Sequence, residues 1–225
     1  MLSGIMRKGW YTVQTGNIID EAVRFIAELY QGNSDGHGFD HSMRVYRSAL
    51  LIAEAEESCD RETVALAALL HDADDYKLFS TENNANARAF LTAHQVPPER
   101  IETICAAINS VSFSKNRGKR PGSVEGQIVQ DADRLDAIGA IGVARTFAYG
   151  GGHGRTLEES VRHFHEKLLL LKDLMNTSKA REMAESRHLF MLSFLAEWEK
   201  ENATQAPVPP AAGLQHRTGS SQESD

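Results

Sequence analysis

The apolar residues of this chain recur at three- and four-residue intervals, which is the period of an amphipathic helix. The first such face lies between residues 17 and 30 and consists of Ile19, Val23, Ile26 and Tyr30. Asn17 is placed to cap this helix. A second helix is expected from Asp40, with His41 in its first turn and Val45, Ala49 and Ile52 directed inward. The pattern therefore predicts two helices in the first quarter of the chain.

A third helix is expected from about Asp60 to His71, and its apolar residues surround it on every side. A helix without a polar face is typical of the centre of a bundle. It ends in the letters HDADD, and burying such carboxylates without partners is costly. The end of the central helix is therefore the first place to look for chemistry.

Further helices are expected over residues 84–94 and from Pro98, which suits the first position of a helix. Ser123 is expected to cap one long helix that continues to Tyr149, with Gly139 and Gly142 serving close packing rather than marking its end. Residues 150–156 then form a flexible connection, followed by helical stretches over 161–176 and 179–200. Because no strand-like alternation occurs, the sequence predicts an all-α fold.

The composition indicates one globular unit. Hydrophobic residues make up 41% and charged residues 24% of the chain, with no break in composition between residues 17 and 200. We expect an N-terminal extension over 1–16, one domain over 17–200 and a disordered tail over 201–225, which is rich in Ala, Pro, Gly, Ser and Gln.

Charge and cysteine content narrow the class of protein. A net charge of −7 argues against a stable nucleic-acid partner, although it leaves a nucleotide substrate open. Cys59 and Cys105 form no metal or disulfide pattern, which favours a reducing compartment. No apolar run reaches the roughly 18 residues that span a bilayer, and the N-terminus does not read as a secretory signal. We expect a cytoplasmic protein without membrane contact.

Two histidines and two aspartates are the candidates for chemistry. His41, the pair His71–Asp72, and Asp133 each lie on or at the end of a different predicted helix. Imidazole nitrogens with carboxylate oxygens suit Mn, Fe, Co, Ni, Zn or Mg, and four such ligands leave octahedral positions open for water and phosphate. Spacing alone is weak evidence, because an adjacent His–Asp pair is common by chance.

The strings GHGFDHSMRVY, ALLHDADDYK and VQDADRLDAIGAIGVARTF resemble the HD superfamily of metal-dependent phosphohydrolases, in particular small bacterial members with a DADRLDAIGAIG segment. The likeness extends over about residues 17–200. It implies a single-domain helical HD bundle with one divalent metal ion.

The resemblance implies the ligands His41, His71, Asp72 and Asp133. Asp133 is preferred to Asp131 by the family pattern, and the two lie roughly 200° apart around a helix, so they cannot easily share an ion. HD proteins with several metals carry extra histidines between the doublet and the distal aspartate. Here only His94 lies in that interval, which favours one ion.

Further candidate groups lie around the ligands, one implied by the resemblance and the others by their position and charge. Asp75, three residues after Asp72, corresponds to the general acid/base of related nucleotidases, and Lys77 is placed to bind phosphate. Arg44 lies one turn after His41, where it can reach phosphate or orient a carboxylate such as Asp72. Lys115, Arg117, Lys119 and Arg120 form a basic loop that can close over a polyphosphate, although charged loops are usually just solvated.

The resulting expectation is hydrolysis of a phosphate ester or anhydride in a small nucleotide, as a nucleoside triphosphate pyrophosphohydrolase or a nucleotidase. The alternatives are a cyclic-nucleotide or alarmone hydrolase, a catalytically silent metal- or ligand-binding regulatory module, and a helical interaction protein without metal. The apolar faces of the last two helices also allow a homodimer.

Overall fold

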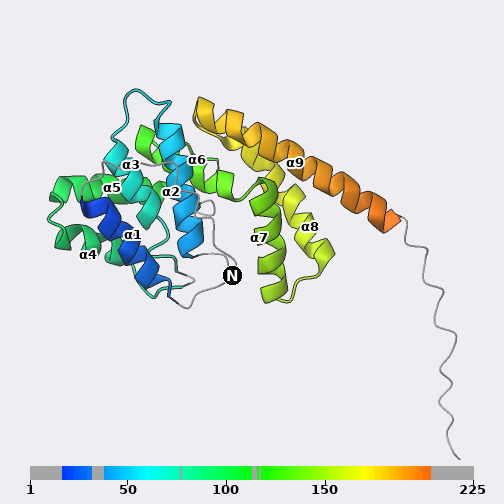
Figure 1. The fold of residues 1–225 in the computed structure, drawn as a ribbon, viewed down its shortest axis with the longest axis horizontal. Coiled ribbons are helices and arrows are strands. Elements are labelled where there is room, and N and C mark those ends of the chain that lie inside the picture. The colour runs from blue at the N-terminus through cyan, green and yellow to red at the C-terminus, as the bar shows by residue number, and fades with distance from the viewer. Residues whose placement is uncertain (1–16, 32–37, 77, 113–115, 117, 204–225) are drawn as a thin grey trace, which may run out of the picture.

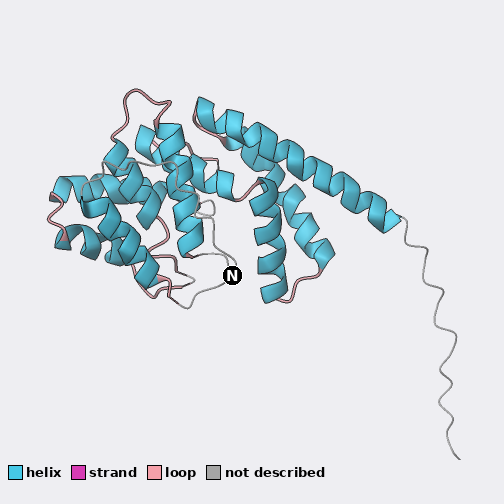
Figure 2. Cartoon of the chain, in the orientation of Figure 1, coloured by secondary structure: helices cyan, strands magenta, loops and turns pink. Residues whose placement is uncertain are grey.

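The structure is a computed structural model, and it describes residues 17–31, 38–76, 78–112, 116 and 118–203. Every regular element in these ranges is a helix, and none of the ranges contains a strand (Figure 2). The predicted all-α fold is confirmed. The described helices include none that is both long and apolar enough to cross a bilayer.

The first three helices follow the predicted pattern. They are α1 (Asn17–Leu29), α2 (Phe39–Ala53) and α3 (Arg61–Leu70). Every residue of α3 from Thr63 to Leu70 is buried, so this helix is the centre of the bundle, as predicted. Asp60 caps it by accepting hydrogen bonds from the backbone N–H groups of Glu62 and Thr63. Each fully buried leucine of α3 contributes about 1.5–3 kcal/mol through the hydrophobic effect.

The next two helices, α4 (Ala85–Ala93) and α5 (Pro98–Val111), also lie where the sequence predicts them. Pro98 occupies the start of α5, where its missing N–H has no helical acceptor to lose. The predicted apolar stripe of α5 is buried and consists of Ile101, Ile104, Cys105 and Ile108.

The long helix predicted from Ser123 to Tyr149 is wrong, because the chain breaks it into α6 (Val124–Asp136) and α7 (Gly139–Gly152). Ile138 is extended and Gly139 has φ +75°, a conformation that glycine adopts without strain. Gly139 therefore lies at the break between the two helices, whereas we expected it to serve packing inside one continuous helix. Gly142 does serve close packing, because a Cβ there would lie 2.2 Å from the carbonyl oxygen of Ala137.

The C-terminal region also differs from the prediction in detail. Residues 150–152 belong to the end of α7 rather than to a flexible connection. Thr156 and Glu159 form a capping box that starts α8 (Leu157–Glu166). The stretch 161–176, predicted as one helix, is divided between the end of α8 and the 3₁₀ helix η1 (Leu168–Leu174). The helix predicted over 179–200 is α9 (Ser178–Ala203). The domain boundaries at residues 16 and 200 stay predictions.

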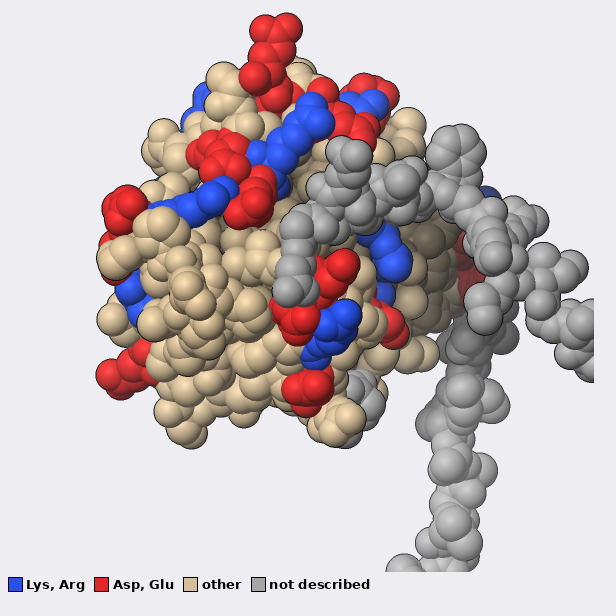
Figure 3. Space-filling model, turned by 60° about the vertical axis from the view of Figure 1, so that its left-hand side comes forward, with Lys and Arg blue, Asp and Glu red and all other residues tan. Residues whose placement is uncertain are grey.

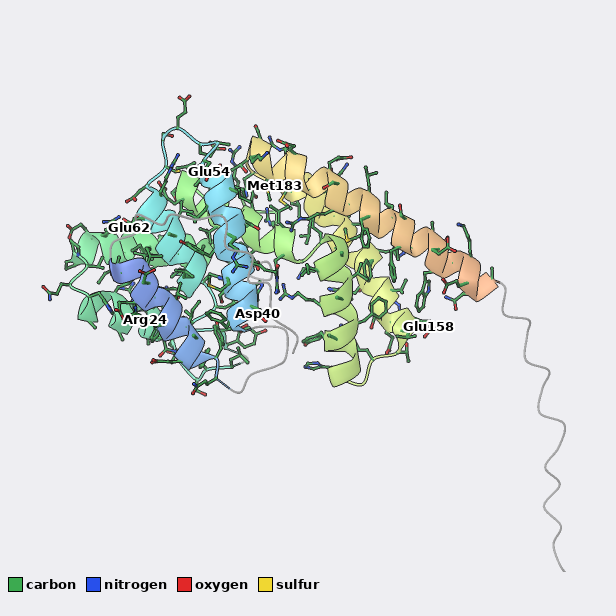
Figure 4. All side chains as sticks on the ribbon, viewed as in Figure 1. Arg24, Asp40, Glu54, Glu62, Glu158 and Met183 are labelled. Atoms are coloured by element: carbon green, nitrogen blue, oxygen red, sulfur yellow. The ribbon has the colours of Figure 1, made fainter. Side chains whose placement is uncertain are left out.

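The helices form two groups that meet at α6 (Figure 1). On one side, α1, α2 and α5 pack around α3, and α4 packs against α5. On the other side, α7, α8 and α9 pack together. Arg24 of α1 and Glu158 of α8 mark the two sides, with Asp40 at the start of α2 between them (Figure 4). Because α6 contacts α2 and α5 as well as α9, its side chains face both groups.

Candidate metal centre

Three helices bring the predicted ligands together. His41 lies in the first turn of α2, and His71 is the C-cap of α3 with Asp72 directly after it. Asp133 lies in the last turn of α6. Both histidines are buried, whereas Asp72 and Asp133 keep side-chain exposures of 20% and 29%. The cluster therefore has a buried imidazole floor and a carboxylate side that solvent or a ligand can reach.

The potential ligand atoms converge on one point. The Nε2 atoms of His41 and His71 are 3.2 Å apart. Asp72 Oδ2 lies 3.4 Å from each of them, and Asp133 Oδ1 lies 3.5 Å from His41 Nε2 and 3.9 Å from His71 Nε2. His41, His71 and Asp133 each offer a ligand atom within 4.8 Å of the others, which is close enough to share one ion.

The outer nitrogens of the two rings determine what the inner nitrogens can do. His41 Nδ1 donates to Asp136 Oδ2 at 2.7 Å, and His71 Nδ1 donates to the carbonyl oxygen of Ala68 at 2.9 Å. In the neutral rings, both Nε2 atoms are then acceptors. Two nitrogen lone pairs and two carboxylates facing one another need a cation between them. This donor set fits a divalent metal ion.

The pKa of His71 also indicates that the cluster favours a positive charge. Burial alone would lower the pKa of His71, but the negative charges of Asp72 and Asp133 outweigh burial and raise that pKa to about 9. The cluster therefore attracts positive charge, either as a proton on His71 or as a metal ion in its place.

Asp136 is the main group that the sequence reasoning missed. It is buried, and besides His41 it accepts hydrogen bonds from Arg44 Nε at 2.6 Å and from Arg145 Nη1. Burial opposes its negative charge, yet the hydrogen bonds from His41 and Arg44 hold the pKa of Asp136 well below its usual range. Asp136 stays ionised and fixes the tautomer of His41. Its position one helical turn after Asp133 was the available signal.

Arg44 also belongs to this arrangement, but its partner is Asp136 and not Asp72, which the sequence suggested. Its guanidinium makes two hydrogen bonds to Asp136, at 2.6 and 3.1 Å, rather than orienting Asp72. The shared face of α2 predicted its proximity to His41 correctly. The partner depended on the approach of α6, which local spacing does not reveal.

The carboxylates of the acidic run HDADD have different surroundings. Asp72 faces the cluster, while Asp74 accepts hydrogen bonds from the backbone N–H groups of Asn86 and Ala87 at the start of α4. Asp75 is half-buried in the turn after α3, where its carbonyl accepts from Leu78 and Phe79. Lys77 lies outside the described residues.

Tyr30 is a further group near the cluster that the sequence reasoning assigned only to packing. Its hydroxyl is buried, and burial together with the charges of Asp72 and Asp75 raises its pKa well above the ordinary value. Tyr30 therefore stays protonated beside the acidic side of the site.

Asp131 has a structural environment. Its carboxylate is fully buried and accepts hydrogen bonds from the backbone and side chains of Asn176 and Thr177, at 2.8 to 3.0 Å. It connects α6 to the start of α9 and points away from the histidines, which agrees with the expected angular separation from Asp133.

Known proteins resemble this chain over the segment that contains the cluster. A family model described as HD domain matches residues 38–138, a segment that contains the whole cluster. YpgQ of Bacillus subtilis is 41% identical over 186 residues, which make up 79% of this chain and 90% of YpgQ.

Two solved structures are similar in both sequence and fold. The crystal structure of Bacillus subtilis YpgQ in complex with ADP has a TM-score of 0.69 at 34% identity and covers 81% of this chain and 97% of its own. An HD-superfamily hydrolase from Bacillus thuringiensis has a TM-score of 0.69 at 37% identity, covering 83% and 97%. With a relative this similar over most of both lengths, and with the family match over the cluster, the chain belongs to the HD-domain superfamily.

Proposed function

We propose that this chain is a metal-dependent phosphohydrolase that acts on a small nucleotide, with one divalent ion held by His41, His71, Asp72 and Asp133. The observation that carries the proposal is the convergence of two histidine lone pairs and two carboxylates. The two Nε2 atoms are 3.2 Å apart, and one Oδ atom of each carboxylate lies 3.4 to 3.9 Å from both of them. When bound, a divalent ion supplies Lewis acidity toward a phosphoryl oxygen and acidifies a water molecule.

The protein groups around the ion have separate roles in this proposal. Asp136 holds His41 in the tautomer that presents Nε2 to the cluster, and Arg44 holds Asp136 in place. We assign Arg44 as a positioning residue rather than a phosphate ligand, because Asp136 already occupies its guanidinium. Asp75 is the proposed general acid/base, and Lys77 is the proposed phosphate contact.

A nucleotide is the proposed substrate class because of the relative YpgQ, whose crystal structure was determined in complex with ADP. Charge supports a small substrate over a long nucleic acid. The chain carries a net charge of −7, and Lys and Arg are interspersed with Asp and Glu on the face drawn in Figure 3. The bond cleaved is proposed to be a phosphate anhydride or ester of that nucleotide.

Metal-restored turnover tests the proposal. The metal-depleted chain receives Mn, Ni, Co, Zn or Mg one at a time, and release of phosphate and pyrophosphate is measured on nucleoside mono-, di- and triphosphates. We expect at least one metal to restore turnover and Asp72→Ala to abolish it. Asp75→Asn should lower kcat by about 10²–10⁴-fold while metal affinity is retained. Asp20→Asn, a change of the same kind on the exposed surface of α1, should leave kcat unchanged.

The outcomes separate the rival functions. Pyrophosphate release from triphosphates would identify a pyrophosphohydrolase, and phosphate release from monophosphates would identify a nucleotidase. Metal binding without turnover on any nucleotide would contradict the enzyme and favour a regulatory module. Unchanged kcat in Asp75→Asn would remove Asp75 from the chemistry.

A further inference from the structure

A pocket lies beside α6, between the loop before α6 and the junction of η1 with α9. Its cavity volume is about 190 Å³. The lining residues that carry charge are Lys119, Arg120, Arg134, Arg181 and Asp173. Four basic side chains against one carboxylate is an unusual local balance in a chain whose net charge is −7.

The hydrogen bonds of the basic groups in this pocket go to neutral acceptors. Arg120 donates to the side-chain oxygen of Gln127, and Arg181 donates to the backbone carbonyls of Met175 and Asn176. These acceptors are neutral, and no described carboxylate forms an ion pair with any of the four cations. An anion entering the pocket would therefore meet basic groups that form no ion pair with a described carboxylate.

Arg134 is the strongest indication that the pocket is built for an anion. Its side chain is buried, with 4% exposure, and it lines the pocket. One guanidinium nitrogen donates to the carbonyl of Leu174, while Nε is buried without a hydrogen-bond partner among the described residues. Such a group is costly unless something satisfies it.

The pocket is separate from the metal cluster. Arg134 and Asp133 are adjacent in sequence and therefore point about 100° apart around α6. Asp133 and Asp136 face α2, where His41 and Arg44 lie. The face of Arg134 also carries Gln130 and Asp131, which bond Asn176 at the start of α9.

We propose that this pocket is a second, metal-independent binding site for a small phosphate-type oxyanion, such as inorganic phosphate or pyrophosphate. Arg134 forms its floor, and Lys119, Arg120 and Arg181 surround its opening. Guanidinium groups match phosphate oxygens through paired hydrogen bonds, which makes phosphate the favoured anion. Pockets for drug-sized ligands occupy about 300–1,000 Å³, so the smaller volume here favours the inorganic anion over a whole nucleotide.

Calorimetric titration of the metal-depleted full chain with pyrophosphate, and separately with phosphate, tests the site. The test variant is Lys119→Gln combined with Arg120→Gln, because both side chains are exposed and their loss should not affect folding. The matched control is Arg162→Gln combined with Lys200→Gln, which removes the same charge from exposed positions on α8 and α9. We expect the test variant to weaken pyrophosphate binding about tenfold or more, and the control to bind like the wild type.

Four outcomes would overturn the proposal. If pyrophosphate fails to bind the metal-depleted chain, the pocket has no ligand. The same conclusion follows if pyrophosphate binds the test and control variants equally. Binding that appears only with added metal and disappears in Asp133→Asn belongs to the metal cluster. ADP binding more tightly than pyrophosphate, through Lys119 and Arg120, would contradict the assignment to a small anion. The titration does not depend on turnover, so it stands or falls separately from the proposed function.

Discussion

Asp136 shows how one buried carboxylate organises the site. It takes hydrogen bonds from His41, Arg44 and Arg145, so two helices beyond its own converge on it. The charge of Asp136 is retained because three donors replace the water it loses on burial. By accepting the Nδ1 proton of His41, Asp136 directs the Nε2 lone pair toward the cluster, where it can act as a metal ligand.

Replacing Asp136 with asparagine tests this role. Asp136→Asn keeps the size of the side chain but removes the charge that fixes the His41 tautomer. We expect metal affinity to fall about 10–100-fold, the usual cost of losing a group that orients a ligand. Calorimetric metal titration measures this, with Asp20→Asn as the matched exposed control. Equal affinity in Asp136→Asn and wild type would mean that His41 needs no orienting carboxylate; a melting curve checks that the variant is folded.

The break between α6 and α7 is the element that completes the site. In one continuous helix, Arg145 would lie about 13.5 Å along the axis from Asp136, since nine residues separate them. The turn at Ile138 and Gly139 redirects the chain and brings the Arg145 guanidinium onto the Asp136 carboxylate. The DAIGAIG segment is therefore a corner with a function in the site.

Two alanine substitutions in α7 test how tight this corner is. A Cβ at Gly142 would meet the Ala137 carbonyl oxygen at 2.2 Å, whereas a Cβ at Gly151 would meet nothing within 4 Å. We expect Gly142→Ala to destabilise the protein by about 1–3 kcal/mol. Gly151→Ala should be neutral or stabilising by up to about 1 kcal/mol, because alanine is the better helix former. Urea unfolding measures both, and equal midpoints would show that the corner tolerates a side chain.

Across the whole chain, the features that could be predicted from the sequence were those set by neighbouring residues. The order of the helices followed from apolar spacing, and the run HDADD indicated where polar groups had to gather. The partners of Asp136 and Asp131 were not predictable, because they come from helices distant in the sequence. Reading 123–149 as one helix hid the position of Arg145, since helical periodicity continues on both sides of Gly139. The anion pocket depends on the meeting of α6, η1 and α9, which no local pattern encodes.

Every role proposed for the site depends on one divalent ion held by His41, His71, Asp72 and Asp133. Titration of Mn²⁺ into the metal-depleted chain, with free Mn²⁺ followed by electron paramagnetic resonance, tests this assignment most directly. We expect one tightly bound ion per chain and at least about tenfold weaker binding in Asp133→Asn, because the variant loses a charged ligand. Asp131→Asn changes the other aspartate of the segment Asp131-Ala132-Asp133, and we expect this variant to keep the tight site. Equal Mn²⁺ binding in Asp133→Asn and wild type, or no binding at all, would contradict the assignment.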